Sequence, residues 1–282
     1  MFWKVRQKAY LGSGTLHRSM KRDWVNRLFV ERSDLFLRLL NQRWSGTEKL
    51  VDGITKVLDG FGIEAGHLLD LCCGNGRVSI HMAKRGFKAV GVDISRAFLE
   101  DAERRAREHG VSNLVTFLEG DIRNLVEVVK TRYSRPFDVL VNTWASLGFY
   151  KKEDDLSMFK QARKLSKEGA ILFVAEMMHT EYLSIKFAPT SYTDLDRFII
   201  LENRKYEPIT SQASTSWIFY NKRGQDLELI DKVEITYHVY SLSELSFLLL
   251  EAGWKTVASY GNLSTLQPMG PLTHMNIVAK AV

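Results

Sequence analysis

The chain has 282 residues, of which 45% are hydrophobic and 26% charged, and a net charge of +6. This composition excludes a disordered tail and fits one large α/β domain, alone or with an elaboration. No apolar run approaches the roughly 20 residues that a membrane span needs, and the charged start does not resemble a signal peptide. The two adjacent cysteines, Cys72 and Cys73, build neither an ordinary disulfide nor a zinc site, so we expect no metal and a reducing, cytoplasmic setting.

The positive charge is concentrated at the N-terminus. Residues 1–22 contain six basic residues and no acidic one, so the other 260 residues sum to zero. This basic arm could contact an anionic partner such as RNA or a phosphorylated substrate. It could also be a solvated terminus or, since aromatic residues are interleaved with the basic ones, a lid over a site. All three interpretations stay open.

The next segment, residues 23–65, is expected to form an N-terminal helical segment or lid, because apolar residues recur at helical spacing over 23–59. Strands and helices then alternate. Helices are expected after the first Gly-rich turn as far as residue 84, from 95 to 110 and at 153–166, and the strand-like runs lie at 67–72, 88–93, 114–118, 137–142 and 170–176. Such alternation predicts a parallel sheet with helices on both faces, so the fold class is α/β.

The pattern changes over residues 177–240, which contain strand-like runs without helices between them, at 197–206, 213–221 and 226–240. In the last run four apolar residues alternate with Glu234, Thr236, His238 and Tyr240, which predicts a half-buried strand with those four on its polar face. We expect a small inserted antiparallel sheet. The main fold resumes at 241–282 with a helix that a capping box of Ser241 and Glu244 begins, followed by two strands, at 254–260 and 274–280.

The strongest motif runs from Asp70 to Gly76, at the end of the first strand. Gly74 and Gly76 would let the backbone turn sharply and approach a ligand closely. Asp93 ends the second strand, where an ionised carboxylate can accept hydrogen bonds from both hydroxyls of a ribose. A third acidic residue, Asp121, follows the third strand and could accept a hydrogen bond from an adenine amino group, with Ile122 against the ring.

Each of these residues also has a structural explanation, since Asp70 could cap a loop or helix and Asp93 and Asp121 could belong to turns. Their joint position at the ends of consecutive strands favours a ligand site. The fourth strand, 137–142, ends in Asn142 and is followed by polar and aromatic residues that would face the same crevice.

With these motifs the chain resembles class I S-adenosylmethionine-dependent methyltransferases. The acidic-x-x-x-Gly-x-Gly pattern matches Asp70 to Gly76, and the acidic residues of strands two and three match Asp93 and Asp121. The resemblance covers residues 66–176 and 241–282. It implies a Rossmann-like sheet of seven strands, the last antiparallel, with S-adenosylmethionine as cofactor and S-adenosylhomocysteine as product.

The resemblance also implies roles for individual residues. Asp93 would bind the ribose, Asp121 the adenine amine, and Asn142 or its backbone would lie near the methyl group. The remaining implied cofactor-binding residues surround the methionine moiety or the adenine: Asp70, Cys72, Gly74, Asn75, Gly76, Ile94 and Ile122. Candidates for the acceptor pocket come from the N-terminal helix and from the segment after strand four: Trp24, Arg43, Trp144, Phe149 and Tyr150.

A general base is needed only if the acceptor must lose a proton, and the candidates are Tyr150 and His179, with Glu176 and His238 less favoured. Transfer to N or O of a small molecule is the expected reaction. An RNA methyltransferase that uses the basic arm is the alternative, and a non-catalytic cofactor-binding module also stays open. A nicotinamide dehydrogenase would need a small residue such as glycine or alanine where this chain has Ser79. Oligomeric state is not indicated.

Overall fold

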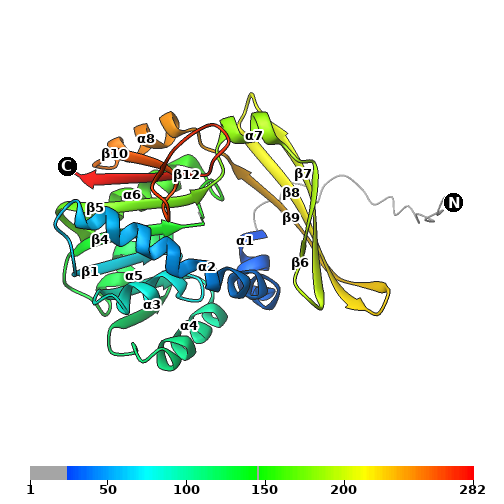
Figure 1. Cartoon of the computed structure of the whole chain (residues 1–282), viewed down its shortest axis with the longest axis horizontal. Helices are drawn as coiled ribbons and strands as arrows, with labels where there is room; N and C mark the ends of the chain where they lie inside the picture. Colours follow the sequence, from blue (N-terminus) through cyan, green and yellow to red (C-terminus); the bar gives the residue numbers. More distant parts are fainter. Residues whose placement is uncertain (1–23, 145) are drawn as a thin grey trace.

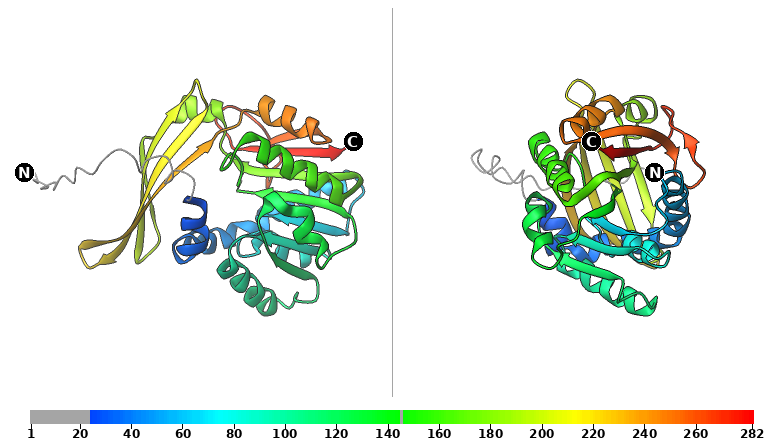
Figure 2. Two further views of the ribbon diagram at one scale, coloured as in Figure 1. Left: turned by 180° about the vertical axis from the view of Figure 1, so that it is seen from behind. Right: turned by 90° about the vertical axis from the view of Figure 1, so that its left-hand side faces the viewer.

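The computed structural model describes residues 24–144 and 146–282, and it contains two β-sheets and their helices (Figure 1). The basic arm predicted at residues 1–22 lies outside the described residues. Among the described helices, none is both long and apolar enough to cross a membrane. The larger sheet and its helices form one layered body, and the smaller sheet stands beside it next to the N-terminal helices (Figure 2).

The larger sheet has the strand order β11-β10-β12-β5-β4-β1-β2-β3. Strands β1 to β5 pair in parallel, and β12 is antiparallel to both of its neighbours, β5 and β10. The strand bounds are β1 His67–Leu71, β2 Lys88–Asp93, β3 Val115–Glu119, β4 Phe137–Thr143, β5 Ser166–Met177, β10 Trp254–Asn262, β11 Gln267–Pro268 and β12 Met275–Ala281.

This topology confirms the predicted Rossmann-like sheet with an antiparallel last strand. The sheet has eight strands rather than seven, because the two-residue β11 pairs with the end of β10. Proline 268 lies in β11, at the edge of the sheet, where no ladder hydrogen bond is needed from it. A strand this short leaves no alternation in the sequence that could predict it.

Helices cover both faces of the sheet: α2 Ser33–Asp59, α3 Arg77–Ala83, α4 Arg96–Glu108, α5 Leu125–Lys130, α6 Lys152–Leu165 and α8 Leu242–Glu251. The strands alternate their side chains between two apolar cores. Along β4, Val139 and Val141 pack in the core that includes α2 and α3, whereas Leu140 packs in the core that includes α5, α6 and α8. The strands are therefore apolar on both faces, as a buried parallel sheet requires.

The N-terminal segment is helical, as predicted, but it is not one helix. A short α1, Trp24–Asn26, continues as a π-helix, Arg27–Glu31, and Arg32 leaves helical geometry before α2 begins. The apolar face of this segment packs against the smaller sheet in a shared cluster that includes Trp24, Leu28 and Phe198. The N-terminal helices thus connect the two sheets (Figure 1).

The smaller sheet confirms the predicted antiparallel insertion. Its strands run in the order β6-β7-β8-β9, with bounds β6 Thr190–Asp194, β7 Phe198–Glu207, β8 Gln212–Arg223 and β9 Asp226–His238. Strand β6 and helix α7, Thr180–Lys186, were not predicted. The sequence of β6 has one aromatic residue and no aliphatic one, so it lacks the apolar alternation by which a half-buried strand is recognised.

Two local expectations about the end of the insertion are wrong. Tyr240 lies beyond β9 and is fully buried, with its hydroxyl donating a hydrogen bond to Asp155 at 2.6 Å, so it is not on a polar face. The capping box is only half formed. Ser241 accepts a hydrogen bond from the backbone nitrogen of Glu244, but the Glu244 carboxylate bonds to His238 and to Lys152 instead of returning to the helix start.

Candidate functional site

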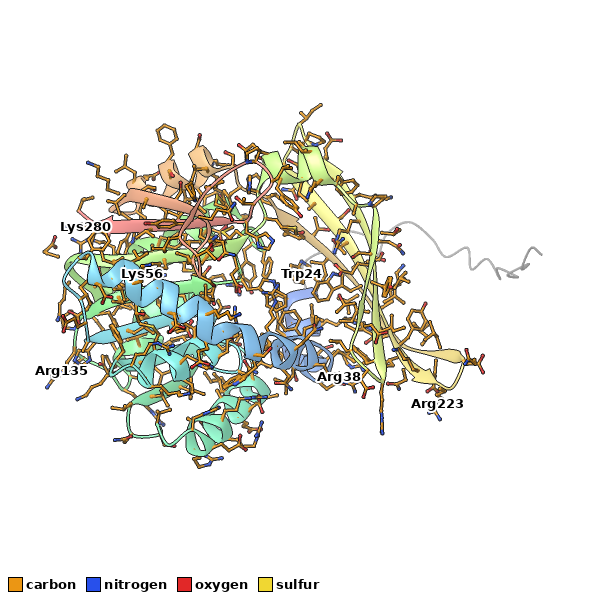
Figure 3. The ribbon with its side chains drawn as sticks, in the orientation of Figure 1. Trp24, Arg38, Lys56, Arg135, Arg223 and Lys280 are labelled. Carbon is orange, nitrogen blue, oxygen red and sulfur yellow. The ribbon has the colours of Figure 1, made fainter. Side chains whose placement is uncertain are left out.

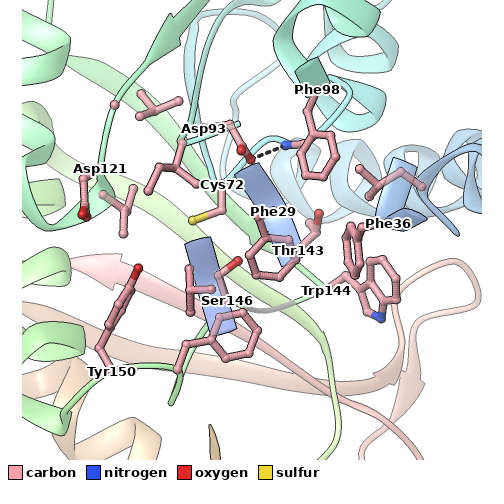
Figure 4. A pocket seen from close by; sticks show the side chains of 18 residues that line it. Phe29, Phe36, Cys72, Asp93, Phe98, Asp121, Thr143, Trp144, Ser146 and Tyr150 are labelled. Carbon is pink, nitrogen blue, oxygen red and sulfur yellow. Dashed lines mark hydrogen bonds between the residues drawn. The ribbon is translucent and has the colours of Figure 1, made fainter. Parts of the chain in front are cut away.

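A cavity of about 750 Å³ opens at the carboxyl ends of β1, β2, β3 and β4 (Figure 4). Ligands of open α/β sheets bind at this end, since the loops that follow the strands diverge there. Six of the ten residues expected to bind the cofactor line this first cavity: Cys72, Gly74, Asp93, Ile94, Asp121 and Ile122. The sequence therefore brings together side chains from three separate strand ends.

Gly74 and Asp93 form the base of the first cavity. The Gly74 backbone has φ +55°, and its nitrogen donates a hydrogen bond to Asp93 Oδ2 at 2.8 Å. The other carboxylate oxygen accepts from the Ser95 nitrogen at 2.9 Å. Burial raises the pKa of Asp93 to about 6, although the backbone hydrogen bonds lower it. Each oxygen keeps a further lone pair, so the carboxylate can still accept hydrogen bonds from a diol.

Asp70 and Gly76 do not line the cavity, and their place beside the ligand stays a prediction. The Asp70 carboxylate is buried and accepts hydrogen bonds from the backbone nitrogen and hydroxyl of Ser79, at 3.2 and 2.8 Å, so it caps the start of α3. Gly76 has φ +72°, and an added Cβ would lie 2.7 Å from the Phe117 ring and 2.9 Å from Ala102. Its lack of a side chain lets α4 and β3 pack closely.

Asn75 and Asn142 also lie outside the cavity walls. Both are fully buried. The Asn75 amide donates hydrogen bonds to Asn41 at 3.1 Å and to Asp101 at 3.4 Å, which ties the turn to α2 and α4. The Asn142 amide donates to the Leu71 carbonyl at 2.9 Å and thereby ties β4 to β1. Both side chains therefore fix the backbone around the site without lining the cavity.

The adenine-side residue Asp121 is engaged by a neighbour. Both of its carboxylate oxygens accept hydrogen bonds from the Arg123 guanidinium, at 3.0 and 2.9 Å. Partial burial favours the protonated acid, but the Arg123 hydrogen bonds lower the pKa of Asp121 overall. The same guanidinium lies 4.3 Å from the centre of the Tyr150 ring. Asp121 is thus an anion at neutral pH whose direction is set by Arg123.

Tyr150 does not suit the role of general base. Its ring lines the first cavity rather than the second, which is described below. Burial raises the pKa of Tyr150 to about 12, so the phenolate is scarce at neutral pH. Tyr150 lines the same cavity as the adenine-side segment Gly120 to Ile122, and its assignment to the substrate pocket stays a prediction.

A second cavity, of about 1440 Å³, lies between the N-terminal helices and strands β7, β8 and β9. It adjoins the first one, since Phe29, Phe36, Trp144 and Phe149 line both. Phe36 stacks on Trp144 with ring centres 5.2 Å apart, as these side chains lie in Figure 4. Four of the five residues expected in an acceptor pocket line this second cavity: Trp24, Arg43, Trp144 and Phe149. Figure 3 labels Trp24, which lies between the helices of the larger sheet and the smaller sheet.

Charged groups of both signs line the second cavity. Glu176 has φ +60°, accepts a hydrogen bond from the buried Arg77 at 2.6 Å, and lies 3.4 Å from Arg43. The Arg43 guanidinium in turn lies 3.9 Å from the centre of the Trp144 ring. Across the cavity, Arg204 donates to Glu202 at 2.6 Å. The carboxylates are therefore compensated, and the cavity offers both hydrogen-bond donors and acceptors.

Sequence reasoning missed Phe29, Phe36, Glu202 and Arg204 as wall residues. The two phenylalanines follow an ordinary helical pattern, and Glu202 and Arg204 lie in a half-exposed strand. The sequence therefore does not distinguish these four residues from ones with a purely structural role. Glu176, considered as a base, does line the second cavity.

His179 is not available as a general base. The side chain is buried, its Nδ1 bonds to Glu181 at 2.8 Å, and its Nε2 bonds to the carbonyl oxygen of Thr273 at 2.9 Å. It lines neither cavity. A base needs a free ring nitrogen within reach of the acceptor, and His179 has both nitrogens engaged by protein groups.

The chain matches known methyltransferase sequences. The family model described as "Methyltransferase domain" matches residues 64–219. The chain is 32% identical to YqeM of Bacillus subtilis over 151 residues, 52% of this chain and 57% of YqeM. It is 28% identical to the ubiquinone biosynthesis O-methyltransferase of Histophilus somni over 149 residues, 49% of this chain and 60% of that protein. The chain thus spans less than two thirds of the length of these relatives.

A shorter match is to a protein of Protochlamydia amoebophila named as an uncharacterized RNA methyltransferase, 34% identical over 95 residues, 33% of this chain and 21% of that protein. Among solved structures, a S-adenosylmethionine-dependent methyltransferase from Clostridium acetobutylicum superposes with a TM-score of 0.70 at 18% identity, covering 83% of this chain and 91% of that one. The sugar N-methyltransferase KedS8 from a Streptoalloteichus species superposes with a TM-score of 0.65 at 14% identity, covering 99% of both chains.

At these identities the structural likenesses show the fold, whereas the family model covers more than half of the chain. The family match removes the nicotinamide dehydrogenase from the alternatives. Because the family model and the Rossmann-like sheet agree, the chain belongs to the methyltransferase-domain family.

Proposed function

We propose that this enzyme transfers a methyl group to a nitrogen or oxygen atom of a small polar molecule held in the second cavity. One observation carries the proposal: the second cavity adjoins the first through a shared wall of four aromatic side chains, Phe29, Phe36, Trp144 and Phe149. A donor in the first cavity and an acceptor in the second would meet at that wall.

The residues of the first cavity fit the cofactor. Gly74 has no Cβ where a ligand would approach, and the nearest atom to an added one, Leu40 Cδ1, lies 3.2 Å away in a flexible side chain. Asp93 would accept hydrogen bonds from the ribose hydroxyls, and Asp121 would accept one from the adenine amine. Ile94 and Ile122 would pack against the adenine ring. When bound, S-adenosylmethionine supplies an electrophilic methyl group on a sulfonium.

The protein's contribution is then mainly alignment. Holding two reactants in attack geometry can supply roughly 7–11 kcal/mol of a barrier, so an activated donor needs little further chemistry. The shared wall adds an electrostatic effect, because aromatic faces attract cations. The rings of Phe36 and Trp144 stack on each other at this wall, and the wall would stabilise the positive charge of a sulfonium beside it.

The lining of the second cavity supports a small polar acceptor. Trp144 and Trp217 each stack on Phe36, with ring centres 5.2 and 5.9 Å away, and these rings line the cavity together with the ion pairs of Glu176 and Glu202. Sugars and other polyhydroxylated or amino-substituted molecules use such a mixture of flat apolar and polar contacts. The name of KedS8, a sugar N-methyltransferase, and that of the ubiquinone biosynthesis O-methyltransferase agree with this class.

RNA remains the second candidate, because a relative is named as an RNA methyltransferase and residues 1–22 are strongly basic. The wall of the second cavity does not favour RNA, since Glu176 and Glu202 are paired with arginines and leave no surplus of positive charge for phosphate groups.

The two candidates are separated by supplying the full chain with methyl-labelled S-adenosylmethionine and a fractionated cell extract. We expect the label in the low-molecular-mass fraction, and its loss in the Asp93→Ala variant. Label found only in RNA, lost with rising salt and abolished by deleting residues 1–22, would contradict the proposal.

A further inference from the structure

His238 and His274 are the two histidines that line the second cavity, and His238 is the one whose ring is held by a carboxylate. It lies at the end of β9 and lines the cavity. Its Nε2 is hydrogen-bonded to both carboxylate oxygens of Glu244, at 3.0 and 3.1 Å. No residue in the described ranges, 24–144 and 146–282, hydrogen-bonds its Nδ1. One ring nitrogen is therefore held by a carboxylate, and the other is free to accept a proton.

His238 also lies beside the boundary between the two cavities. Its backbone nitrogen donates a hydrogen bond to the Gly148 carbonyl at 2.9 Å, and Gly148 precedes Phe149, which lines both cavities. Gly148 has φ +75°, and an added Cβ would lie 2.1 Å from the His238 carbonyl oxygen. Only glycine permits this approach, so the segment after β4 and the end of β9 are fixed against each other.

Glu244 connects His238 to the outside of the molecule. The carboxylate lies in the wall of a surface hollow between α6 and α8 and accepts a hydrogen bond from Lys152 at 3.1 Å. Burial favours its protonated form, but the hydrogen bonds from His238 and Lys152 lower the pKa of Glu244 overall. The carboxylate therefore stays charged and can stabilise a positive charge on His238.

We propose that His238 is the general base that removes the proton of the acceptor, an inference that rests on the proposed function. Glu244 is the positioning residue that orients the His238 ring and stabilises its positive charge. The acceptor lone pair would form the bond to the methyl carbon while the carbon–sulfur bond of the donor breaks and leaves its electron pair on sulfur, and the proton of the acceptor nitrogen or oxygen would pass to Nδ1 of neutral His238. The resulting imidazolium is compensated by Glu244 and later releases a proton to water. The acceptor class is accordingly an amine or hydroxyl group, which must lose a proton to complete transfer.

Other charged and titratable groups lie around His238. The Tyr240 ring centre lies 4.7 Å from that of His238, and the Tyr240 hydroxyl bonds to Asp155 on α6. Lys152 reaches Glu244 from the start of the same helix. Among these groups of the described residues, Glu244 is the one whose side chain hydrogen-bonds the ring.

The first experiment needs no acceptor. In nuclear magnetic resonance spectra, the ring signals of His238 should differ between Glu244→Gln and the parent, since Nε2 loses its carboxylate partner. Glu251→Gln is the matched control, because Glu251 lies on the same helix and also accepts a hydrogen bond from a lysine of α6, Lys160, at 3.2 Å. Unchanged His238 ring signals in Glu244→Gln would overturn the proposal.

The second experiment measures turnover with labelled S-adenosylmethionine and the low-molecular-mass fraction of a cell extract. His238→Gln should lower the rate at neutral pH by about 10²- to 10⁴-fold without changing the cofactor Kd. Glu244→Gln should lower it less and move the acid limb of the pH–rate profile to lower pH, whereas Glu251→Gln should match the parent. Parental turnover in His238→Gln would overturn this proposal alone. An inactive parent would instead count against the proposed function, and the ring signals of His238 would still decide the pairing with Glu244.

Discussion

The carboxylate of Asp93 and the backbone nitrogen of Gly74 meet at 2.8 Å although 19 residues separate them in the chain. This hydrogen bond joins the end of β2 to the turn after β1. It orients the carboxylate at the floor of the first cavity and holds the turn in the left-handed conformation that glycine tolerates. The relationship makes Asp93 the residue on which cofactor affinity should depend most.

Replacing Asp93 by Asn should raise the Kd of S-adenosylmethionine by about 10- to 100-fold. A hydrogen bond to a charged group contributes about 1.5–3 kcal/mol, and about 1.4 kcal/mol corresponds to a tenfold change. Titration calorimetry measures the Kd, and Asp226→Asn, in an exposed hairpin of the smaller sheet, is the control. A folded Asp93→Asn protein with parental affinity would refute the assignment of this cavity.

Replacing Gly76 by Ala should destabilise the fold more than it affects ligand contacts. An added Cβ would lie 2.7 Å from the Phe117 ring and 2.9 Å from Ala102, and the positive φ adds roughly 1–2 kcal/mol of strain. Gly86→Ala is a matched control, because Gly86 also has a positive φ but no atom within 4 Å of the added carbon. Thermal unfolding should give Gly76→Ala clearly the lower Tm. Equal losses in both variants would show that backbone strain alone matters.

The ion pair of Arg77 and Glu176 should contribute to stability as a coupled unit. Arg77 is buried, and removing Glu176 would leave its guanidinium without a compensating carboxylate. A double-mutant cycle of Arg77→Met and Glu176→Gln, measured by urea unfolding, should give a coupling energy of about 1–3 kcal/mol. The exposed pair Lys160–Glu251 should give about 0–1 kcal/mol in the same experiment. Similar values for the two pairs would contradict this interpretation.

The buried Asp70 should make the fold lose stability as the pH rises. Burial raises the pKa of Asp70 from 3.8 to about 7, although hydrogen bonds from Ser79 lower it. Between these values the folded state binds a proton that the unfolded state has released, so the free energy of unfolding decreases with pH over this window. Asp70→Asn cannot ionise, and its stability relative to the parent should increase from pH 4 to pH 7. A pH-independent difference between the two proteins would show that Asp70 is not perturbed.

Much of the fold and part of the site were predictable from local patterns. The β2 bounds coincide with the predicted 88–93, because an apolar run ends there in a carboxylate. The sequence predicts the turn from Asp70 to Gly76, but the residues of this turn contact different parts of the structure. Gly74 and Cys72 face the cavity, whereas Asn75 bonds to α2 and α4. A motif of seven residues does not show which members face a ligand, since that depends on helices elsewhere in the chain.

Most wall residues of the second cavity could not be predicted from the sequence. Its walls come from the N-terminal helices, the loop after β4 and strands β7 to β9, which are brought together only by tertiary packing. His238 illustrates the difficulty. In the sequence it is one polar residue of a strand with an alternating pattern. Only the three-dimensional structure shows that it hydrogen-bonds Glu244 near the start of α8, where the sequence predicts a capping box.

The central claim is that the donor lies between Gly74, Asp93 and Ile122, with its reacting end toward the aromatic wall shared by the two cavities. A crystal structure of the full chain with S-adenosylhomocysteine tests this directly. The account predicts ribose hydroxyls on the Asp93 carboxylate and the sulfur beside Phe36 and Trp144. Ligand density elsewhere, or a first cavity closed by packed side chains while the ligand is bound, would contradict it.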